Sequence, residues 1–132
     1  MGTSSHFIGR VYAADEVIYQ QGDTGETMYL VGHGLVEILQ RKGDKEYCLG
    51  TLSEGDFFGE MALFGYTTRT ATARAGPEGA VILTLEKKSF LKRLHHDPSM
   101  AFEMMKKMAD RIQHLERELV LTGEALLPME LQ

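Results

Sequence analysis

Short apolar runs separated by glycine-containing turns fill most of the chain before residue 86. The runs lie at 17–19, 28–31, 35–39, 47–52, 57–58 and 80–85. The breaks between them fall at 21–26, 32–34, 41–45, 55–56 and 76–79, and each break contains glycine. Short strands at this spacing, divided by glycine and aspartate turns, predict a sandwich or a jelly-roll barrel.

The hydrophobic period becomes helical in the last third of the chain. Residues 88–95 have apolar positions at helical spacing, which predicts a first helix. Asp97 followed by Pro98 is a strong start signal, because aspartate suits the N-cap and proline suits the first helical position. The second helix is predicted to run from 98 to about 122 and to stop at Gly123.

The apolar positions of the second helix step by four and three residues in turn, which is a heptad seam. They are Ala101, Met105, Met108, Ile112, Leu115 and Leu119. This seam, on a helix long enough to overhang a small domain, favours a homodimer formed through 98–122. Phe102, Met104 and Leu121 lie outside the seam, so a second face can pack on the barrel. The alternative is one wide stripe that is buried on the chain's own barrel.

A length of 132 residues fits one domain with its own core. The predicted class is mainly β with C-terminal α, in which a sandwich or a jelly-roll barrel is followed by a long helix. We expect a flexible lead at 1–8, one domain at 9–122 and a tail at 123–132. Within that domain the barrel occupies 9–86 and the helices occupy 87–122.

The net charge and the cysteine content limit the classes of ligand and site that the chain can have. A net charge of −5 does not attract nucleic acid or an acidic membrane, so any anion needs a local site. The one cysteine, Cys48, excludes a disulfide framework and a four-cysteine metal site within the chain, and its apolar neighbours predict a buried small side chain. No run reaches membrane-spanning length, and the N-terminus lacks a signal-peptide core, so we expect a cytoplasmic protein.

Residues 55–74 carry the candidate chemistry. Gly59-Glu60 opens a short run of helix formers, and a glycine there lets a ligand approach the backbone closely. The N–H groups of the first helical turn then favour an anion. Arg69 follows Gly59 at a distance that allows the loop to fold back, and its guanidinium suits a phosphate. The alternative is structural: Glu60 complements the helix start and Arg69 is its ion-pair partner.

Three motifs together resemble the cyclic nucleotide-binding domain, as found in the bacterial catabolite activator family, in cyclic-nucleotide-dependent kinases and in cyclic-nucleotide-gated channels. The motifs are Gly22-Asp23-x-Gly25-Glu26-x-x-Tyr29-x-Val31-x-x-Gly34, Gly55-Asp56-x-x-Gly59-Glu60-Met61-Ala62-Leu63 and Arg69-Thr70-Ala71. The resemblance covers roughly residues 9–120, and it implies a double-stranded β-helix (jelly-roll) barrel followed by a long helix of the dimerisation type. It implies a regulatory sensor whose ligand is a 3′,5′-cyclic mononucleotide and which relays binding to the C-terminal helix.

The resemblance also implies the roles of individual residues. N–H groups around Gly59 to Met61 meet the cyclic phosphate, Glu60 accepts from the ribose 2′-hydroxyl, and Arg69 pairs with an exocyclic phosphate oxygen. Thr70 gives a hydroxyl and an N–H to the phosphate or the base. The rest of the implied ligand-binding set is Ala62, Ala71, which leaves space, and Leu49 and Gly50, which line the base.

Base selectivity is the point at which this chain departs from the catabolite activator pattern. Arg111 matches an arginine near the ligand, but Leu115-Glu116 stands where a threonine–serine pair would read the adenine amino group. A carboxylate at Glu116 can accept from adenine or from guanine. Cyclic AMP is favoured as the ligand, and cyclic GMP stays open.

Two other functions compete with the sensor. A metal-dependent jelly-roll enzyme needs clustered histidines, but only His33 lies in the strand region, so no metal, cofactor or catalytic set is predicted. The other is an interaction module whose barrel holds a different ligand, such as a cyclic di-nucleotide, or none. The chain shows no helix-turn-helix after Gly123, so we expect no nucleic-acid binding by this chain alone, and either a stand-alone sensor or the sensor half of something larger.

Overall fold

The computed structural model describes residues 8–121. The chain divides into two compact units, with the boundary between Leu91 and Lys92. The first unit contains the strands, and the second contains the long helix. Each unit is described by itself.

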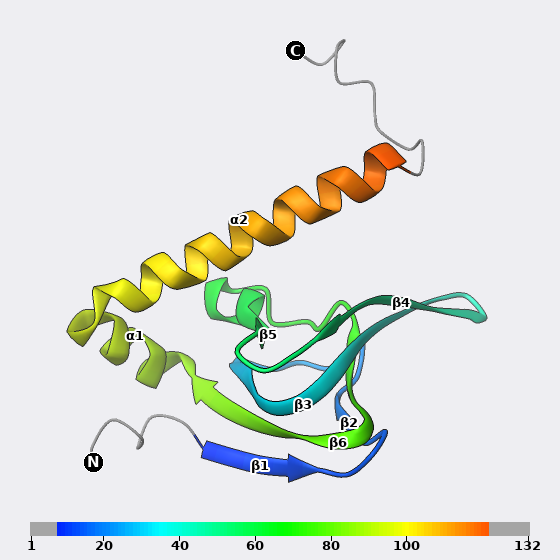
Figure 1. Cartoon of the computed structure of the whole chain (residues 1–132). Coiled ribbons are helices and arrows are strands. Elements are labelled where there is room, and N and C mark those ends of the chain that lie inside the picture. Colours follow the sequence, from blue (N-terminus) through cyan, green and yellow to red (C-terminus); the bar gives the residue numbers. More distant parts are fainter. Residues whose placement is uncertain (1–7, 122–132) are drawn as a thin grey trace. The chain divides into compact units, whose positions relative to one another are not determined.

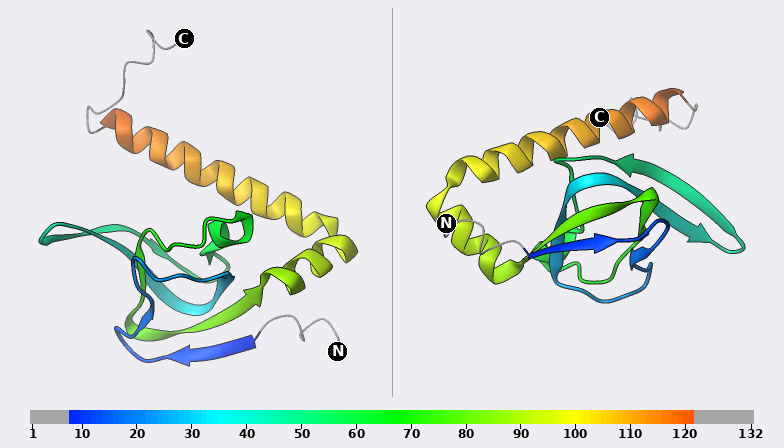
Figure 2. Two further views of the ribbon diagram at one scale, coloured as in Figure 1. Left: turned by 180° about the vertical axis from the view of Figure 1, so that it is seen from behind. Right: turned by 60° about the horizontal axis from the view of Figure 1, so that its bottom comes forward.

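One six-stranded antiparallel sheet forms the first unit (Figure 1). Its elements are β1 (Ile8–Tyr12), β2 (Val17–Tyr19), β3 (Thr27–Lys42), β4 (Lys45–Leu52), β5 (Phe57–Phe58), the 3₁₀ helix η2 (Glu60–Phe64) and β6 (Thr72–Glu86). The strand order is β1-β6-β3-β4, with β2 paired to β6 and β5 paired to β3. The two long strands β3 and β6 curve around a common interior, which the views in Figure 2 show from two sides. The predicted jelly-roll class is confirmed.

Alternation along β6 explains why a run of small residues forms this strand. Ala73 and Ala75 are fully buried, while Thr72 and Arg74, which alternate with them, are half-buried and make polar contacts. Side chains alternate between the two faces of a strand, so the alanines face the interior. They pack in one core with larger apolar side chains, namely Tyr12, Val31, Val36, Phe58 and Ile82.

Two glycine clusters do not end strands, so the predicted breaks at 32–34 and 76–79 were wrong. Gly32-His33-Gly34 lies inside β3, and residues 76–79 lie inside β6. The register between these strands shifts at both places, because glycine permits a bulge within a continuing strand. Gly34 has φ 87° and lies so close to the Gly79 carbonyl that a Cβ atom would stand 2.5 Å from the oxygen.

Cys48 is exposed, so the prediction of a buried cysteine was wrong. It lies on β4, which pairs only with β3 at one end of the sheet order. Its neighbours Tyr47 and Leu49 are also exposed. An apolar run is buried only where another layer covers it, and β4 lacks such a cover in the first unit as described.

Two helices follow β6: α1 (Lys87–His96), which contains the boundary between the units, and α2 (Pro98–Leu121). The start of α2 directly after Asp97 confirms the predicted start signal, and the Met100 N–H donates to the Asp97 carbonyl at 3.1 Å. No helix within 8–121 is long and apolar enough to cross a membrane. The predicted stop at Gly123, the tail and all of the predicted lead except Ile8, which begins β1, lie outside the described residues.

Candidate ligand-binding site

The candidate site begins with a glycine whose backbone adopts the left-handed conformation. Gly59 has φ 74° and precedes η2, which ends at Gly65 with φ 96°. The predicted short helical turn between these glycines is therefore confirmed, although it is a 3₁₀ turn of five residues. A turn this short contributes little macrodipole, so attraction for an anion has to come from individual N–H groups and from a nearby cation.

Arg69 is that cation, and the fold directs its guanidinium back to Gly59. Nη1 donates to the Gly59 carbonyl at 3.2 Å, and Nη2 donates to the Thr27 carbonyl at 2.9 Å and to Thr27 Oγ1 at 3.4 Å. The Gly59 carbonyl also accepts the Ala62 N–H at 3.3 Å, so it joins Arg69 to the first turn of η2. The ten-residue loop thus folds back as the sequence predicted.

Backbone pairing with the segment after β2 holds the Arg69 main chain. The Arg69 carbonyl accepts the Gly22 N–H at 2.7 Å, the Arg69 N–H donates to the Asp23 carbonyl at 2.8 Å, and the Gly25 N–H donates to the Thr67 carbonyl at 2.9 Å. Gly25 has a steric role as well, because a Cβ atom there would lie 2.7 Å from Arg69 Nη2. The Gly-Asp-x-Gly motif at 22–25 therefore forms the backbone surface against which the Arg69 side chain packs.

The two Gly-Asp pairs of the sequence make the same turn. In the first, the Asp23 carboxylate accepts the Gln20 N–H and the Asp23 N–H donates to the Gln20 carbonyl, both at 2.9 Å. In the second, Asp56 makes the same two bonds with Ser53, also at 2.9 Å. The glycine before each aspartate has positive φ, which glycine adopts at little cost.

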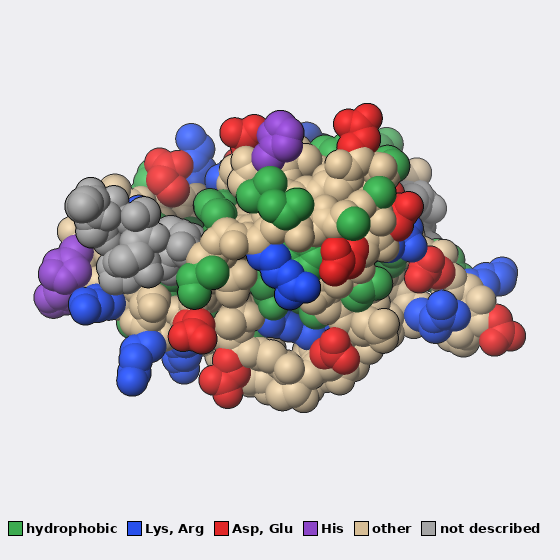
Figure 3. Space-filling view, turned by 90° about the horizontal axis from the view of Figure 1, so that it is seen from below, with side chains coloured by type: hydrophobic (Ala, Val, Ile, Leu, Met, Phe, Trp, Pro, Cys, Tyr) green, Lys and Arg blue, Asp and Glu red, His purple; other side chains and the backbone are tan. Residues whose placement is uncertain are grey.

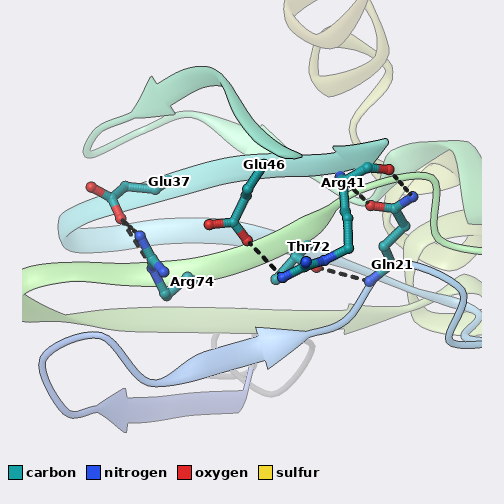
Figure 4. A network of polar contacts seen from close by, with 6 residues as sticks. All are labelled: Gln21, Glu37, Arg41, Glu46, Thr72 and Arg74. Atoms are coloured by element: carbon teal, nitrogen blue, oxygen red, sulfur yellow. Dashed lines mark hydrogen bonds and ion pairs between the residues drawn. The ribbon is translucent and has the colours of Figure 1, made fainter. Parts of the chain in front are cut away.

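A polar network on the outside of the sheet anchors the first of these turns (Figure 4). The Gln21 side chain pairs with the backbone of Arg41, accepting its N–H at 2.7 Å and donating to its carbonyl at 3.1 Å. The Gln21 N–H donates to Thr72 Oγ1 at 2.9 Å. Arg41–Glu46 and Arg74–Glu37 ion pairs lie on the same surface. The segment that positions Arg69 is thus tied to both β3 and β6.

Charge at the site favours an anion. Arg69 is buried, with 6% of its surface exposed, and within residues 8–121 it forms no ion pair with a carboxylate. The structural alternative, an ion pair between Glu60 and Arg69, is therefore not observed. A buried cation that has only carbonyl, hydroxyl and ring partners is incompletely compensated. On the face drawn in Figure 3, acidic and basic side chains are interspersed.

Comparison with known proteins decides the family. A family model described as a cyclic nucleotide-binding domain matches residues 9–97. The chain belongs to this family. The Cyclic AMP receptor protein of Thermus thermophilus is 33% identical over 116 residues, which are 87% of this chain and 53% of that protein. The cGMP-dependent protein kinase, isozyme 1, of Drosophila melanogaster is 42% identical over 89 residues, which are 65% of this chain and 12% of the kinase.

A solved structure agrees with this assignment. The Catabolite Activator Protein of Thermus thermophilus superposes with a TM-score of 0.78 at 32% identity, over 90% of this chain and 56% of that chain. The chain thus spans about half the length of its bacterial relatives. The predicted family and the predicted sensor domain are confirmed, and the chain carries a cyclic nucleotide-binding regulatory domain.

The remaining cassette residues of this cyclic nucleotide-binding domain differ in exposure. Glu60, Ala62 and Ala71 are buried, with 7%, 3% and 8% of their surfaces exposed, whereas Met61 is about half exposed. Thr70 is exposed, and its carbonyl accepts a hydrogen bond from Gln40 Nε2 at 3.1 Å. The structure therefore brings Gly59, Glu60 and Arg69 to one place, while the ligand contacts of the other residues stay predictions.

Leu49 and Gly50, the residues expected at the base, lie at an irregularity of β4. Gly50 pairs with Ile38, whereas the next β3 residue, Leu39, pairs with Cys48. Leu49 is thus the extra residue of a bulge, and 56% of its surface is exposed. The contact of Leu49 with a base stays a prediction.

Arg111 and Glu116 lie on α2, in the second unit, and their contacts with a base stay predictions.

Sequence reasoning missed three partners of Arg69, namely Thr27, Tyr19 and Tyr29. Tyr29 belongs to the quoted motif but had no role assigned, and nothing in the chain marks Thr27 or Tyr19 as neighbours of Arg69. In the part of the chain that the structure describes, no group of three or more histidine, cysteine, aspartate or glutamate side chains is placed to hold a metal ion.

Proposed function

We propose that the barrel binds a 3′,5′-cyclic mononucleotide through Arg69 and Glu60 and that binding is relayed to α2. The observation that carries this proposal is the buried Arg69 guanidinium, which has no carboxylate partner within residues 8–121 and which lies beside Gly59. Its hydrogen bonds to Gly59 and Thr27 use at most three of the five N–H groups of a guanidinium. The others can donate to an exocyclic phosphate oxygen, where a charge-assisted pair is strong.

Glu60 gives the proposed site its preference for a sugar. It follows Gly59 directly and is buried, so its backbone stands one residue from the carbonyl that accepts from Arg69. A carboxylate beside a bound phosphate is useful only if it meets a hydroxyl group, and the ribose 2′-hydroxyl provides one. The N–H groups from Gly59 to Met61 and the Thr70 hydroxyl complete the phosphate shell. The small Ala71 leaves space for the ligand.

The identity of the base is the finer part of the proposal. We propose cyclic AMP, with Leu49 and Gly50 along the base and with Arg111 and Glu116 closing over it from α2. The relatives include both a cyclic AMP receptor and a cGMP-dependent kinase, so they leave cyclic GMP as the competing ligand. The bulge at Leu49 supports a base contact from β4.

The proposed output is a change in an α2 dimer. Four seam residues of α2, namely Met105, Ile112, Leu115 and Leu119, have between 42% and 64% of their surfaces exposed in the single chain. A heptad seam of this kind is buried when two helices pair. A ligand that binds differently to two arrangements of the pair would shift the balance between them. The proposed module is therefore a non-enzymatic sensor that signals by conformation.

Calorimetric titration of the purified chain tests the ligand directly. Cyclic AMP, cyclic GMP, a cyclic di-nucleotide and linear 5′-AMP are each titrated into the same preparation. The proposal expects saturable binding of cyclic AMP, weaker binding of cyclic GMP and little binding of linear 5′-AMP. Absence of binding by both cyclic mononucleotides at millimolar concentration would leave an interaction module as the function.

A further inference from the structure

The guanidinium carbon of Arg69 lies over two tyrosine rings. Its Cζ atom is 4.4 Å from the centroid of the Tyr19 ring and 5.6 Å from the centroid of the Tyr29 ring. Both distances are within the range of a cation–π interaction. The guanidinium N–H groups donate to oxygens of Gly59 and Thr27, so Arg69 is held by hydrogen bonds and by aromatic rings from different residues.

The two tyrosines are held differently. Tyr29 stacks on Phe58 with ring centroids 5.1 Å apart and an interplanar angle of 17°, and its hydroxyl contacts Thr27 Oγ1 at 3.1 Å. It is part of the core packing around β3 and β5. Tyr19, at the end of β2, makes tilted ring contacts with Tyr29 and Phe58, at 5.6 and 6.1 Å. Of the two rings, Tyr19 is the one nearer to the Arg69 charge.

We propose that Tyr19 is a positioning residue for Arg69, which sets the affinity for a cyclic phosphate without touching the ligand. This inference rests on the proposed function of Arg69 as the phosphate-binding residue. An arginine side chain loses several rotatable bonds when it is fixed. A ring that packs against the guanidinium restricts it before the ligand arrives, so binding does not have to order it.

The hydrogen bonds to Gly59 and Thr27 do not fix the guanidinium alone. They act in its plane and allow the side chain to swing about the edge that they hold. The Tyr19 ring removes this motion from one side and keeps water away from the cation, which strengthens its attraction for an anion. Loss of the ring should therefore weaken phosphate binding even though every hydrogen-bonding group of Arg69 remains.

Two substitutions at Tyr19 separate the ring from the hydroxyl. Tyr19→Phe keeps the ring, and Tyr19→Leu removes it. Tyr12→Leu is the matched control, because Tyr12 is a buried tyrosine of the same barrel whose ring lies 4.7 Å from the guanidinium carbon of a different arginine, Arg10. Cyclic AMP affinity is measured by calorimetry at a temperature at which circular dichroism shows all variants folded. Unfolding by urea is measured on the same samples without ligand.

The expected result is specific to Tyr19→Leu. Its affinity falls about three- to thirtyfold, the range that corresponds to a cation–π contact, while Tyr19→Phe and Tyr12→Leu stay within about twofold of the wild type. In ligand-free urea unfolding, the effects of Tyr19→Leu and Arg69→Gln are non-additive, as they are for residues in contact. Wild-type affinity in Tyr19→Leu overturns the inference, as does an equal loss in Tyr19→Phe or additive effects on unfolding. If the wild type binds no cyclic nucleotide, the proposed function fails instead, whereas the unfolding cycle still tests the contact.

Discussion

Replacement of Gly59 by alanine perturbs the backbone turn and the Arg69 contact together. The φ of 74° is left-handed, and an L-residue there costs about 1–2 kcal/mol of folding free energy. The new Cβ atom would also lie 3.0 Å from Arg69 Nη1 and 3.2 Å from the Tyr29 ring. These contacts are tight, so the guanidinium has to move and its hydrogen bond to the Gly59 carbonyl weakens. We expect cyclic AMP affinity to fall by up to about 1.5–3 kcal/mol, the range for a hydrogen bond to a charged group.

Gly65→Ala is the matched control for this prediction. Gly65 ends the same 3₁₀ turn with φ 96°, and a Cβ atom added there would meet nothing within 4 Å. Both variants should lose stability in urea unfolding, because both carry the left-handed penalty, and Gly59→Ala should lose more, because only its Cβ atom meets tight contacts. Only Gly59→Ala should lose affinity in calorimetric titration with cyclic AMP. Equal affinities in the two variants would refute the reasoning that Gly59 is required by the Arg69 geometry.

Three further predictions address the turn before β2, the barrel core and α2. Asp15 has φ 63°, so Asp15→Gly should leave stability unchanged or raise it by up to about 1 kcal/mol in urea unfolding, and a clear loss would contradict this. Burial raises the pKa of Tyr12 above its ordinary 10.0, so the neutral phenol stabilises the fold below pH 10 and this stability is lost as pH rises through the folded pKa. Tyr12→Phe should therefore make the alkaline decline in stability shallower, and an unchanged decline would be evidence against the assignment. Ile112→Glu should convert the proposed dimer to monomer in sedimentation, while Gln113→Glu beside it should not, and equal behaviour of the two would exclude the seam.

The sequence was sufficient to predict the ends of those helices whose ends depend on interactions within a single turn. Asp97-Pro98 starts α2 because capping and a fixed proline φ act within one turn. Gly59 and Gly65 bound η2 because each adopts the left-handed conformation that glycine favours. The same rule failed at residues 32–34 and 76–79, where long strands continue through glycines as bulges, since pairing partners far along the chain decide that outcome.

The burial of individual side chains and their neighbours in space could not be predicted without the fold. Cys48 stands in an apolar run, but β4 has a pairing partner only in β3, so the run is exposed. Glu60 and Arg69 could be proposed from the sequence, because a glycine at a short helix and a later arginine suit an anion, and because the motifs resemble those of a cyclic nucleotide-binding domain. Their ligand contacts stay predictions. Tyr19 could not be found, because its contact with Arg69 joins positions 50 residues apart, and only the pairing of residues 22–25 with 67–69 brings them together.

The affinity of Arg69→Gln for cyclic AMP tests the central claim most directly. Arg74→Gln is its control, since Arg74 lies on neighbouring β6 and pairs with Glu37 at 2.9 Å on the outside of the sheet. In calorimetric titration, Arg69→Gln is predicted to weaken binding by about 2–3 kcal/mol, which is roughly 30- to 150-fold. Arg74→Gln is predicted to keep the wild-type affinity within about twofold. Wild-type affinity in Arg69→Gln would contradict the assignment of this buried guanidinium as the phosphate-binding group.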